Sequence, residues 1–264
     1  MIRQVEAIAG YLKHSLKAQS RFRLHSPFVY RFYSEVIKNG HAYPQYRVVE
    51  RVRKDLITFS RFIKRKDMGA RAKDFPCDQR FVRVKDIARN SSVTSKKGQF
   101  LFRLTKEFHP ATILELGTSL GISTMYIALA APESRIITIE GCLDSANVAR
   151  ENFDKTGIKN VHIIPGTFEE KLPVAFQELP SLDLVFFDGN HKKEPTLKYF
   201  TECLQHSHPD SVFIFDDINW SKDMKSAWNE IRAHPRVKIS IDLYHLGIVF
   251  FKEELSPEKF SLKM

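Results

Sequence analysis

The chain has 264 residues, of which 43% are hydrophobic and 27% charged, a composition typical of a globular protein rather than of a disordered chain. No apolar run reaches the roughly 18 residues that a membrane-spanning helix needs. The net charge of +10 is unevenly distributed: residues 1–98 hold 23 Lys and Arg against 8 Asp and Glu, while the remainder holds 18 against 23. The basic residues 1–98 either attract a polyanion such as RNA or form an ordinary solvated surface.

Residues 1–98 are predicted to form helices joined by irregular stretches. Apolar residues at helical spacing between Ile2 and Leu16 indicate an amphipathic helix, not a signal peptide. A second helix is expected between a start at Ser26 and a stop at Gly40; its aromatic residues either pack it against the main domain or line an acceptor pocket. A third helix is expected over Tyr46–Lys66. Residues 67–97 carry little periodic apolar content, so we expect a connecting lid or linker there.

From Gln99 onward, short apolar runs alternate with helical patterns, which is typical of a doubly wound parallel sheet. The expected strands are Thr112–Leu116, Arg135–Glu140, Val161–Pro165, Leu182–Asp188 and Ser211–Asp216. The expected helices are Ser123–Ala131, Leu143–Thr156, Lys193–Gln205 and Ser221–His234. Apolar runs at 237–244 and 247–252 predict a terminal antiparallel hairpin. We therefore expect a basic helical extension over residues 1–98, followed over 99–264 by an α/β Rossmann-like domain with a mostly parallel, seven-stranded sheet.

The turn after the first of these strands carries the most information, because ligands of an open parallel sheet bind beyond the carboxyl ends of its strands. In ILELGTSLGIS, Glu115 ends the strand, Gly117 allows a sharp turn and Gly121 begins the next helix. A P-loop would need a Lys after Gly121, and a dinucleotide fingerprint would need a Gly where Ser119 stands. S-adenosylmethionine (SAM) is the remaining ligand class that uses such a turn.

The ELGTSLGIS turn, with Glu140 at the end of the next strand, resembles motifs one and two of class I SAM-dependent methyltransferases. The resemblance implies that Glu140 accepts hydrogen bonds from both ribose hydroxyls and that the residues after the third strand lie against the adenine, although Phe168 could equally belong to the core. The expected cofactor-binding residues are Glu115, Gly117, Thr118, Ser119, Gly121, Ser123, Glu140, Gly141, Thr167, Phe168 and Asp188.

Three aspartates follow the fourth and fifth strands: Asp188, Asp216 and Asp217. Burying an unpaired charge is costly, so we expect them to face the site. Their pattern is similar to that of catechol-type O-methyltransferases and the broader FkbM-like or type 24 methyltransferase group. The resemblance implies that these three residues hold Mg²⁺, a cation that prefers oxygen ligands. Asp217 stands where the catechol family has Asn.

His191 stands where the catechol family has a catalytic Lys. Histidine can take a proton near neutral pH, so His191 is a candidate general base and, with Asp188, a candidate catalytic residue. A role as a metal ligand and a purely structural role remain alternatives.

The leading hypothesis is a SAM-dependent methyltransferase that acts on the hydroxyl of a small-molecule acceptor, with or without Mg²⁺. One alternative is an RNA or protein methyltransferase that uses the basic residues 1–98; against it, the position of a [DN]PP[YF] motif reads DGNH. Another is a non-catalytic SAM-binding module. Three widely spaced cysteines without a CxxC motif favour location in the reducing cytoplasm. The sequence leaves open whether the protein forms a homodimer.

Overall fold

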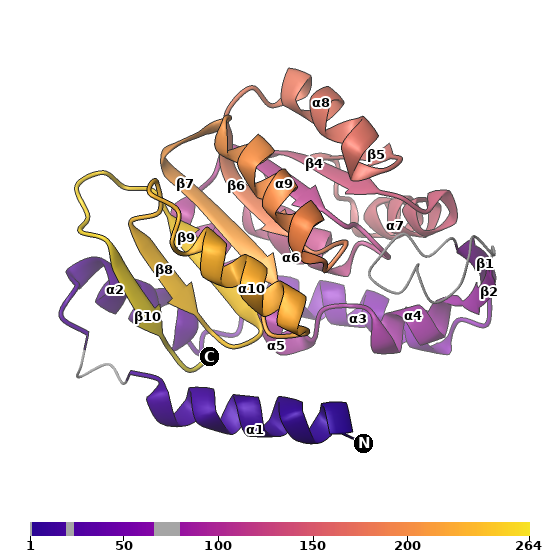
Figure 1. The fold of residues 1–264 in the computed structure, drawn as a ribbon. Coiled ribbons are helices and arrows are strands. Elements are labelled where there is room, and N and C mark those ends of the chain that lie inside the picture. Colours follow the sequence, from indigo (N-terminus) through magenta and orange to yellow (C-terminus); the bar gives the residue numbers. More distant parts are fainter. Residues whose placement is uncertain (1, 20–23, 66–79) are drawn as a thin grey trace. The chain divides into compact units, whose positions relative to one another are not determined.

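The computed structural model describes residues 2–19, 24–65 and 80–264, and the chain in it forms two compact units (Figure 1). One unit comprises residues 40–180, and the other comprises residues 1–39 together with 181–264. The predicted boundary at residue 98 falls inside the first of these units.

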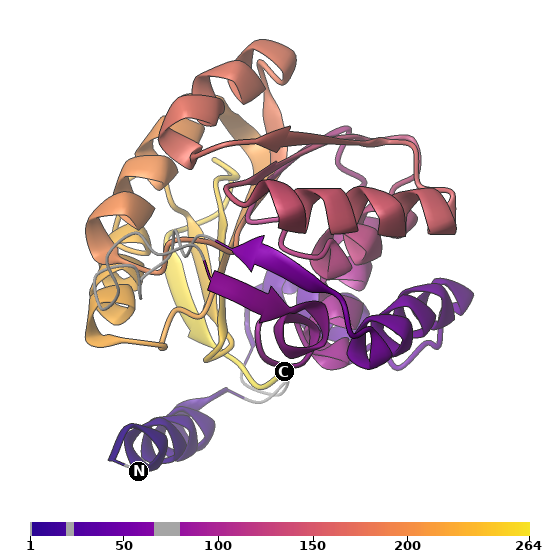
Figure 2. The ribbon, with the colours of Figure 1, turned by 90° about the vertical axis from the view of Figure 1, so that its right-hand side faces the viewer.

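The unit of residues 40–180 is an α/β structure around three parallel strands. These strands are ordered β3-β4-β5, with Leu116 of β3 opposite Ile139 of β4 and Glu140 opposite Pro165 of β5. Its elements are α3 (Pro44–Thr58), β1 (Phe62–Arg65), β2 (Arg80–Arg83), α4 (Val84–Asn90), α5 (Ser95–Phe108), β3 (Thr112–Leu116), α6 (Ile122–Ala130), β4 (Arg135–Glu140), α7 (Leu143–Thr156), β5 (Val161–Pro165) and α8 (Phe168–Glu178). The antiparallel β1–β2 pair, violet in Figure 2, lies beside α7.

The second unit holds five strands in the order β10-β8-β9-β7-β6. Strand β6 runs parallel to β7 and β8 parallel to β10, whereas β9 is antiparallel to both β7 and β8. The elements are α1 (Ile2–Lys17), α2 (Pro27–Phe32), a π-helical turn (Tyr33–Ile37), β6 (Leu182–Phe187), α9 (Lys193–Leu204), β7 (Ser207–Asp216), α10 (Lys222–Ile231), β8 (Ile239–Asp242), β9 (Leu246–Phe250) and β10 (Glu258–Ser261). Helices α9 and α10 pack against each other (Figure 1).

The α/β class and the terminal antiparallel hairpin are confirmed. Three of the predicted strands, β3, β4 and β5, have the predicted bounds. Apart from the β1–β2 pair, the described residues form eight strands instead of the predicted seven, because β10 was missed. Of its four residues only Phe260 is buried, so its sequence shows no alternation of apolar and polar residues.

Two predictions for residues 44–97 were wrong. The helix predicted over Tyr46–Lys66 ends at Thr58, and the chain continues as β1, where Ile63 is buried and Phe62 is exposed in the alternation of a strand. The predicted linker over residues 67–97 lies outside the described residues as far as 79, but its later part forms β2, α4 and the start of α5. Burial explains why α4 forms regular structure in this stretch, because its residues Val84, Ile87 and Ala88 are all in the core.

The aromatic residues of α2 pack the helix onto β9, as one of the two predictions stated. The ring centroids of Phe28 and Phe32 lie 4.9 and 5.6 Å from that of Phe250, in edge-to-face contacts. Tyr30 of the same helix is exposed.

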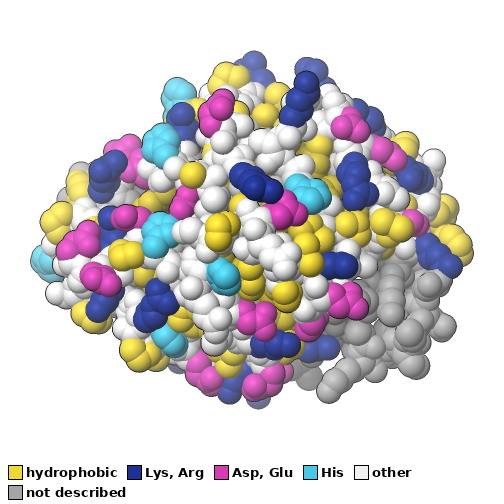
Figure 3. Space-filling model, turned by 90° about the horizontal axis from the view of Figure 1, so that it is seen from above, with side chains coloured by type: hydrophobic (Ala, Val, Ile, Leu, Met, Phe, Trp, Pro, Cys, Tyr) yellow, Lys and Arg dark blue, Asp and Glu magenta, His cyan; other side chains and the backbone are white. Residues whose placement is uncertain are grey.

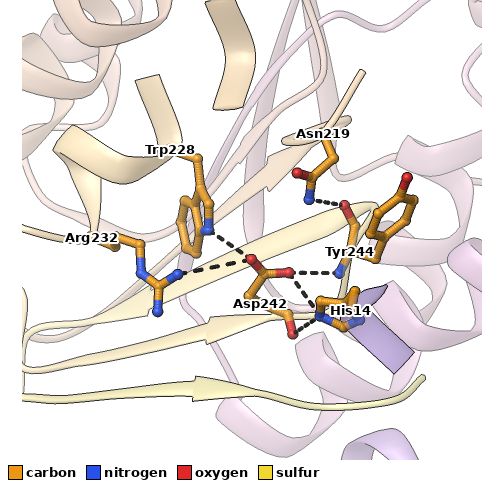
Figure 4. A network of polar contacts seen from close by, with 6 residues as sticks. All are labelled: His14, Asn219, Trp228, Arg232, Asp242 and Tyr244. Carbon is orange, nitrogen blue, oxygen red and sulfur yellow. Dashed lines mark hydrogen bonds and ion pairs between the residues drawn. The ribbon is translucent and has the colours of Figure 1, made fainter. Parts of the chain in front are cut away.

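Helix α1 is attached to β8 through the buried carboxylate of Asp242 (Figure 4). This carboxylate lies 3.1 Å from His14 Nε2 and accepts hydrogen bonds from Trp228 Nε1 at 3.2 Å and from the Tyr244 backbone N–H at 2.8 Å. Burial raises the pKa of Asp242, but the contacts of His14, the Tyr244 amide and the Arg232 charge outweigh it, so the pKa lies below its ordinary value. No helix among the described residues has the length and apolarity needed to cross a membrane.

Candidate functional site

The turn between β3 and α6, residues 117–121, is here called the cofactor loop. Its backbone takes left-handed conformations at Gly117 (φ 111°), Ser119 (φ 49°) and Gly121 (φ 80°). The Gly117 N–H donates to the Ile139 carbonyl at 3.0 Å, and the Gly121 N–H donates to the Thr118 carbonyl at 2.8 Å. The loop is therefore a closed turn whose two glycines satisfy the backbone geometry that the sequence predicted.

Helix α7 packs tightly under this loop. A Cβ atom added to Gly121 would lie 2.6 Å from Cε1 of Phe153, so the contact requires glycine. The neighbouring Asn152 is 2% exposed, and its Nδ2 donates to the Leu120 carbonyl at 2.9 Å. The loop is thus held from below by both packing and a buried hydrogen bond.

Glu140, at the end of β4, also holds the loop in place through hydrogen bonds. Its Oε2 accepts a hydrogen bond from the Ser119 backbone N–H at 2.7 Å, and its Oε1 accepts one from the Cys142 backbone N–H at 2.9 Å. Such charge-assisted bonds fix the carboxylate in place. The Gly166 N–H donates to the Glu140 carbonyl at 2.9 Å, which brings the end of β5 to the same edge.

Glu115 is completely buried beneath the loop. Its carboxylate accepts hydrogen bonds from three hydroxyl groups, those of Ser123 at 2.7 Å, Thr124 at 2.5 Å and Thr138 at 2.7 Å. Burial raises the pKa of Glu115 and the three hydroxyls only partly offset this effect. Glu115 and Ser123 therefore join β3, β4 and α6, and their predicted contact with a cofactor stays a prediction.

The other predicted cofactor residues lie around the same strand ends. The buried Thr118 hydroxyl is 2.6 Å from that of Thr138, whereas the Ser119 hydroxyl is buried without a hydrogen-bond partner among the described residues. Thr167 caps α8 by accepting a hydrogen bond from the Glu170 N–H, and Phe168, half-buried, is the first residue of that helix. Gly141, also half-buried, follows Glu140 directly.

The predicted catalytic and metal residues lie in the second unit, after β6 and β7. Asp188 follows β6, and its Oδ1 lies 3.8 Å from His191 Nε2. Asp216 ends β7, is 4% exposed, and accepts a hydrogen bond from the Asp217 N–H at 2.8 Å. The His191 ring lies 6.1 Å from that of Trp220. Within the described part of the chain, no three His, Cys, Asp or Glu side chains are gathered as metal ligands, so magnesium binding remains a prediction.

Four residues near these sites were not predicted: Thr124, Thr138, Asn152 and Asn190. Asn152 lies four residues after the buried Val148 on the inner stripe of α7, and a polar residue in that stripe is a signal that the sequence offers. Asn190 adopts a left-handed conformation (φ 58°) and donates to the Tyr199 hydroxyl at 3.1 Å. Its buried Oδ1 has no hydrogen-bond partner among the described residues.

Comparisons with known proteins agree on one class. Residues 114–218 match the family model described as "Methyltransferase domain". A catechol O-methyltransferase of Niastella koreensis is 35% identical over 130 residues, covering 48% of this chain and 58% of that protein. A catechol O-methyltransferase of Mycobacterium tuberculosis is 30% identical over 129 residues, covering 48% and 57%. The chain thus spans little more than half the length of these two relatives.

Solved structures agree with the fold. An O-methyltransferase from Bacillus cereus in complex with S-adenosylhomocysteine (SAH) is 21% identical, has a TM-score of 0.55, and the match covers 84% of this chain and 97% of that one. The resemblance inferred from the sequence is confirmed by these findings. Residues 114–218 are therefore similar to a methyltransferase domain.

Proposed function

We propose that this protein transfers the methyl group of SAM to a hydroxyl of a small acceptor. The observation that carries the proposal is the Glu140 carboxylate, which two backbone amides hold at the edge of a glycine-containing loop. A carboxylate fixed in this way is ready to accept hydrogen bonds from a pair of ribose hydroxyls. It would repel a phosphate, and SAM carries none.

The cofactor loop also fits SAM. The Ser119 hydroxyl is buried without a partner among the described residues, and such a group gains free energy when a ligand provides a hydrogen bond. Gly121 is the N-cap of α6, whose first backbone amides suit the carboxylate of the methionine part. When bound, SAM supplies a methyl group on a sulfonium centre that a nucleophile can displace.

We assign the acceptor to the residues after β6 and β7. His191 would take the hydroxyl proton at Nε2 or Nδ1, and the Asp188 carboxylate, 3.8 Å from Nε2, would stabilise the resulting imidazolium. Asp188, Asp216 and Asp217 would hold Mg²⁺, which would lower the pKa of an acceptor hydroxyl. The positions of these residues after adjacent strands support the assignment.

The basic surplus of residues 1–98 favours RNA or protein as a second class of acceptor. The basic residues among 1–98 are scattered along the sequence rather than gathered in one block. Scattered charges are typical of a solvated surface, so we favour the small molecule. On the face drawn in Figure 3, which is one side of the molecule, Lys and Arg side chains are likewise interspersed with Asp and Glu.

The test combines calorimetric titration of SAM and SAH, with Mg²⁺ and with a chelator, and a methyl-transfer assay over phenols, sugars and RNA. We expect SAM binding and methylation of a hydroxylated small molecule, and Asp188→Ala should abolish turnover. Methylation of RNA alone would establish the second class. SAM binding without any turnover would leave a cofactor-binding module, and absence of SAM binding would refute the proposal.

A matched pair of histidines tests the proposed base. His191→Gln should lower kcat about a hundredfold or more, whereas His208→Gln, which removes another His–Asp pair (His208 Nε2 to Asp183 Oδ1, 2.7 Å), should leave kcat unchanged. Equal effects of both substitutions on kcat would contradict the assignment.

We also propose that the protein acts in a reducing compartment such as the cytoplasm. The cysteines in the described part of the chain, Cys142 and Cys203, are buried and unpaired, which supports this placement. Fractionation of cells that express the chain tests it, and recovery from an oxidising compartment would contradict it.

A further inference from the structure

In the unit formed by residues 40–180, residues of helices α3 and α7 line a pocket of about 380 Å³. Its floor is apolar and buried, with Val52, Leu56 and Val148 each at most 7% exposed. The volume lies within the range of small-molecule sites. None of the residues assigned above to SAM or to the acceptor lines this pocket.

The rim of the pocket carries a surplus of positive charge. Arg47, Arg51 and Lys155 are exposed at its edge, and none has an ion-pair partner among the described residues. Of the two acids that also line the pocket, Glu151 is already paired with Arg61, with N···O distances of 2.7 and 3.0 Å. Asp55 is the other. The rim is therefore suited to an anion.

We propose that this pocket binds a small organic anion, a carboxylate on an apolar chain, as a ligand separate from the methyl donor and the acceptor. The floor receives the apolar chain, whose removal from water favours binding. The arginines at the rim receive the carboxylate, for which the planar guanidinium offers two parallel donors. An inorganic anion has no apolar chain to bury on the floor, and a neutral alcohol has no carboxylate for the arginines.

The pocket is also connected to the cofactor loop. Asn152 lines the pocket, and its side chain holds the Leu120 carbonyl at 2.9 Å, next to Gly121. A ligand that restricts α7 at this point restricts the loop as well, so it strengthens binding of the cofactor. This second step rests on the proposed function, whereas binding of the anion does not.

The binding step is tested on the full chain without SAM, by calorimetric titration of decanoate, 1-decanol and inorganic phosphate. We expect saturable binding of decanoate at one site, and at least about tenfold weaker binding of the other two. Arg51→Glu and Arg47→Glu should each weaken decanoate binding about tenfold or more, because each places a like charge beside the carboxylate. The matched control is Lys54→Glu, an exposed α3 residue that changes the net charge equally but does not line the pocket.

Equal weakening by Lys54→Glu, equal binding of 1-decanol, or no saturable decanoate binding would each overturn the proposal. The coupling step is tested by titrating SAH with and without saturating decanoate, and we expect the SAH affinity to rise about fivefold or more. An unchanged SAH affinity would overturn the coupling alone. Failure of SAH to bind at all would refute the proposed function, while decanoate binding would still stand.

Discussion

Replacing Glu140 with Gln keeps the size of the side chain but exchanges one carboxylate oxygen for an NH₂ group. In the parent chain the two oxygens accept hydrogen bonds from the backbone N–H groups of Ser119 and Cys142 at 2.7 and 2.9 Å. The amide nitrogen of Gln cannot accept, so one of these N–H groups would face another donor. We expect the free energy of unfolding to fall by about 1–3 kcal/mol, the cost of leaving such a group unsatisfied.

The same substitution removes the ionic acceptor of the two ribose hydroxyls. Hydrogen bonds to a charged group contribute about 1.5–3 kcal/mol, so SAH should bind roughly 10- to 150-fold more weakly to Glu140→Gln. The assays are calorimetric titration of SAH and urea unfolding of the same preparation. Glu178→Gln is the control, because Glu178 of the same unit also binds two partners, Arg135 and His162, outside the cofactor loop. Parental SAH affinity in Glu140→Gln would refute the ribose assignment, whatever happened to the stability.

Three further predictions concern residues described above. Gly121→Ala should lower the free energy of unfolding in urea by at least about 1 kcal/mol more than Gly157→Ala, because both sites have a positive φ but only at Gly121 would the new Cβ meet another side chain. Asp242→Asn should destabilise the chain strongly at pH 7 and much less as the pH falls through the lowered pKa of Asp242. The reason is that an acid with a depressed pKa stabilises the fold only above that pKa. Urea unfolding across that pH range measures the difference. Asn190→Ala should lower kcat/KM without changing the SAH affinity, because its buried Oδ1 is available to position an acceptor.

Each of these predictions has a result that would contradict it. Equal destabilisation by the two glycine substitutions would mean that the contact with Phe153 relaxes without cost. A destabilisation by Asp242→Asn that is the same at every pH would show that its charge does not contribute. For Asn190 the control is Asn147→Ala, which removes a half-buried hydrogen bond from Arg150 within α7. Equal losses of kcat/KM in the two variants would exclude a specific role of Asn190.

The strands and the cofactor loop could be predicted because their causes are local. Apolar runs bounded by turn residues defined β3, β4 and β5, and the need for a positive φ at Gly117 and Gly121 is visible in the sequence itself. Glu140 could be chosen as a candidate site residue for the same reason, since the apolar run before it places it at the end of a predicted strand.

What the sequence did not reveal depends on residues that are distant in the chain. The burial of Glu115 depends on the hydroxyls of Thr138 in β4 and Thr124 in α6, which no pattern in the residues around Glu115 contains. Strand β1 has only four residues, and the apolar residues around it continue the spacing of α3. Its hydrogen bonds to β2 and its contacts with α7 decide its structure, and no local pattern contains them.

The pairing of His14 with Asp242 joins positions 228 residues apart, and the isolated bridge between Gln19 and Leu262 also joins two distant parts of the sequence. The unit that contains them is therefore assembled from both ends of the sequence, whereas residues 40–180 form an uninterrupted stretch. During synthesis on a ribosome, that stretch emerges whole and can fold early, while helix α1 waits until its partner strand β8 has been translated. Deletion of β8 and β10 should accordingly release α1, although α1 lies far from both strands in the sequence.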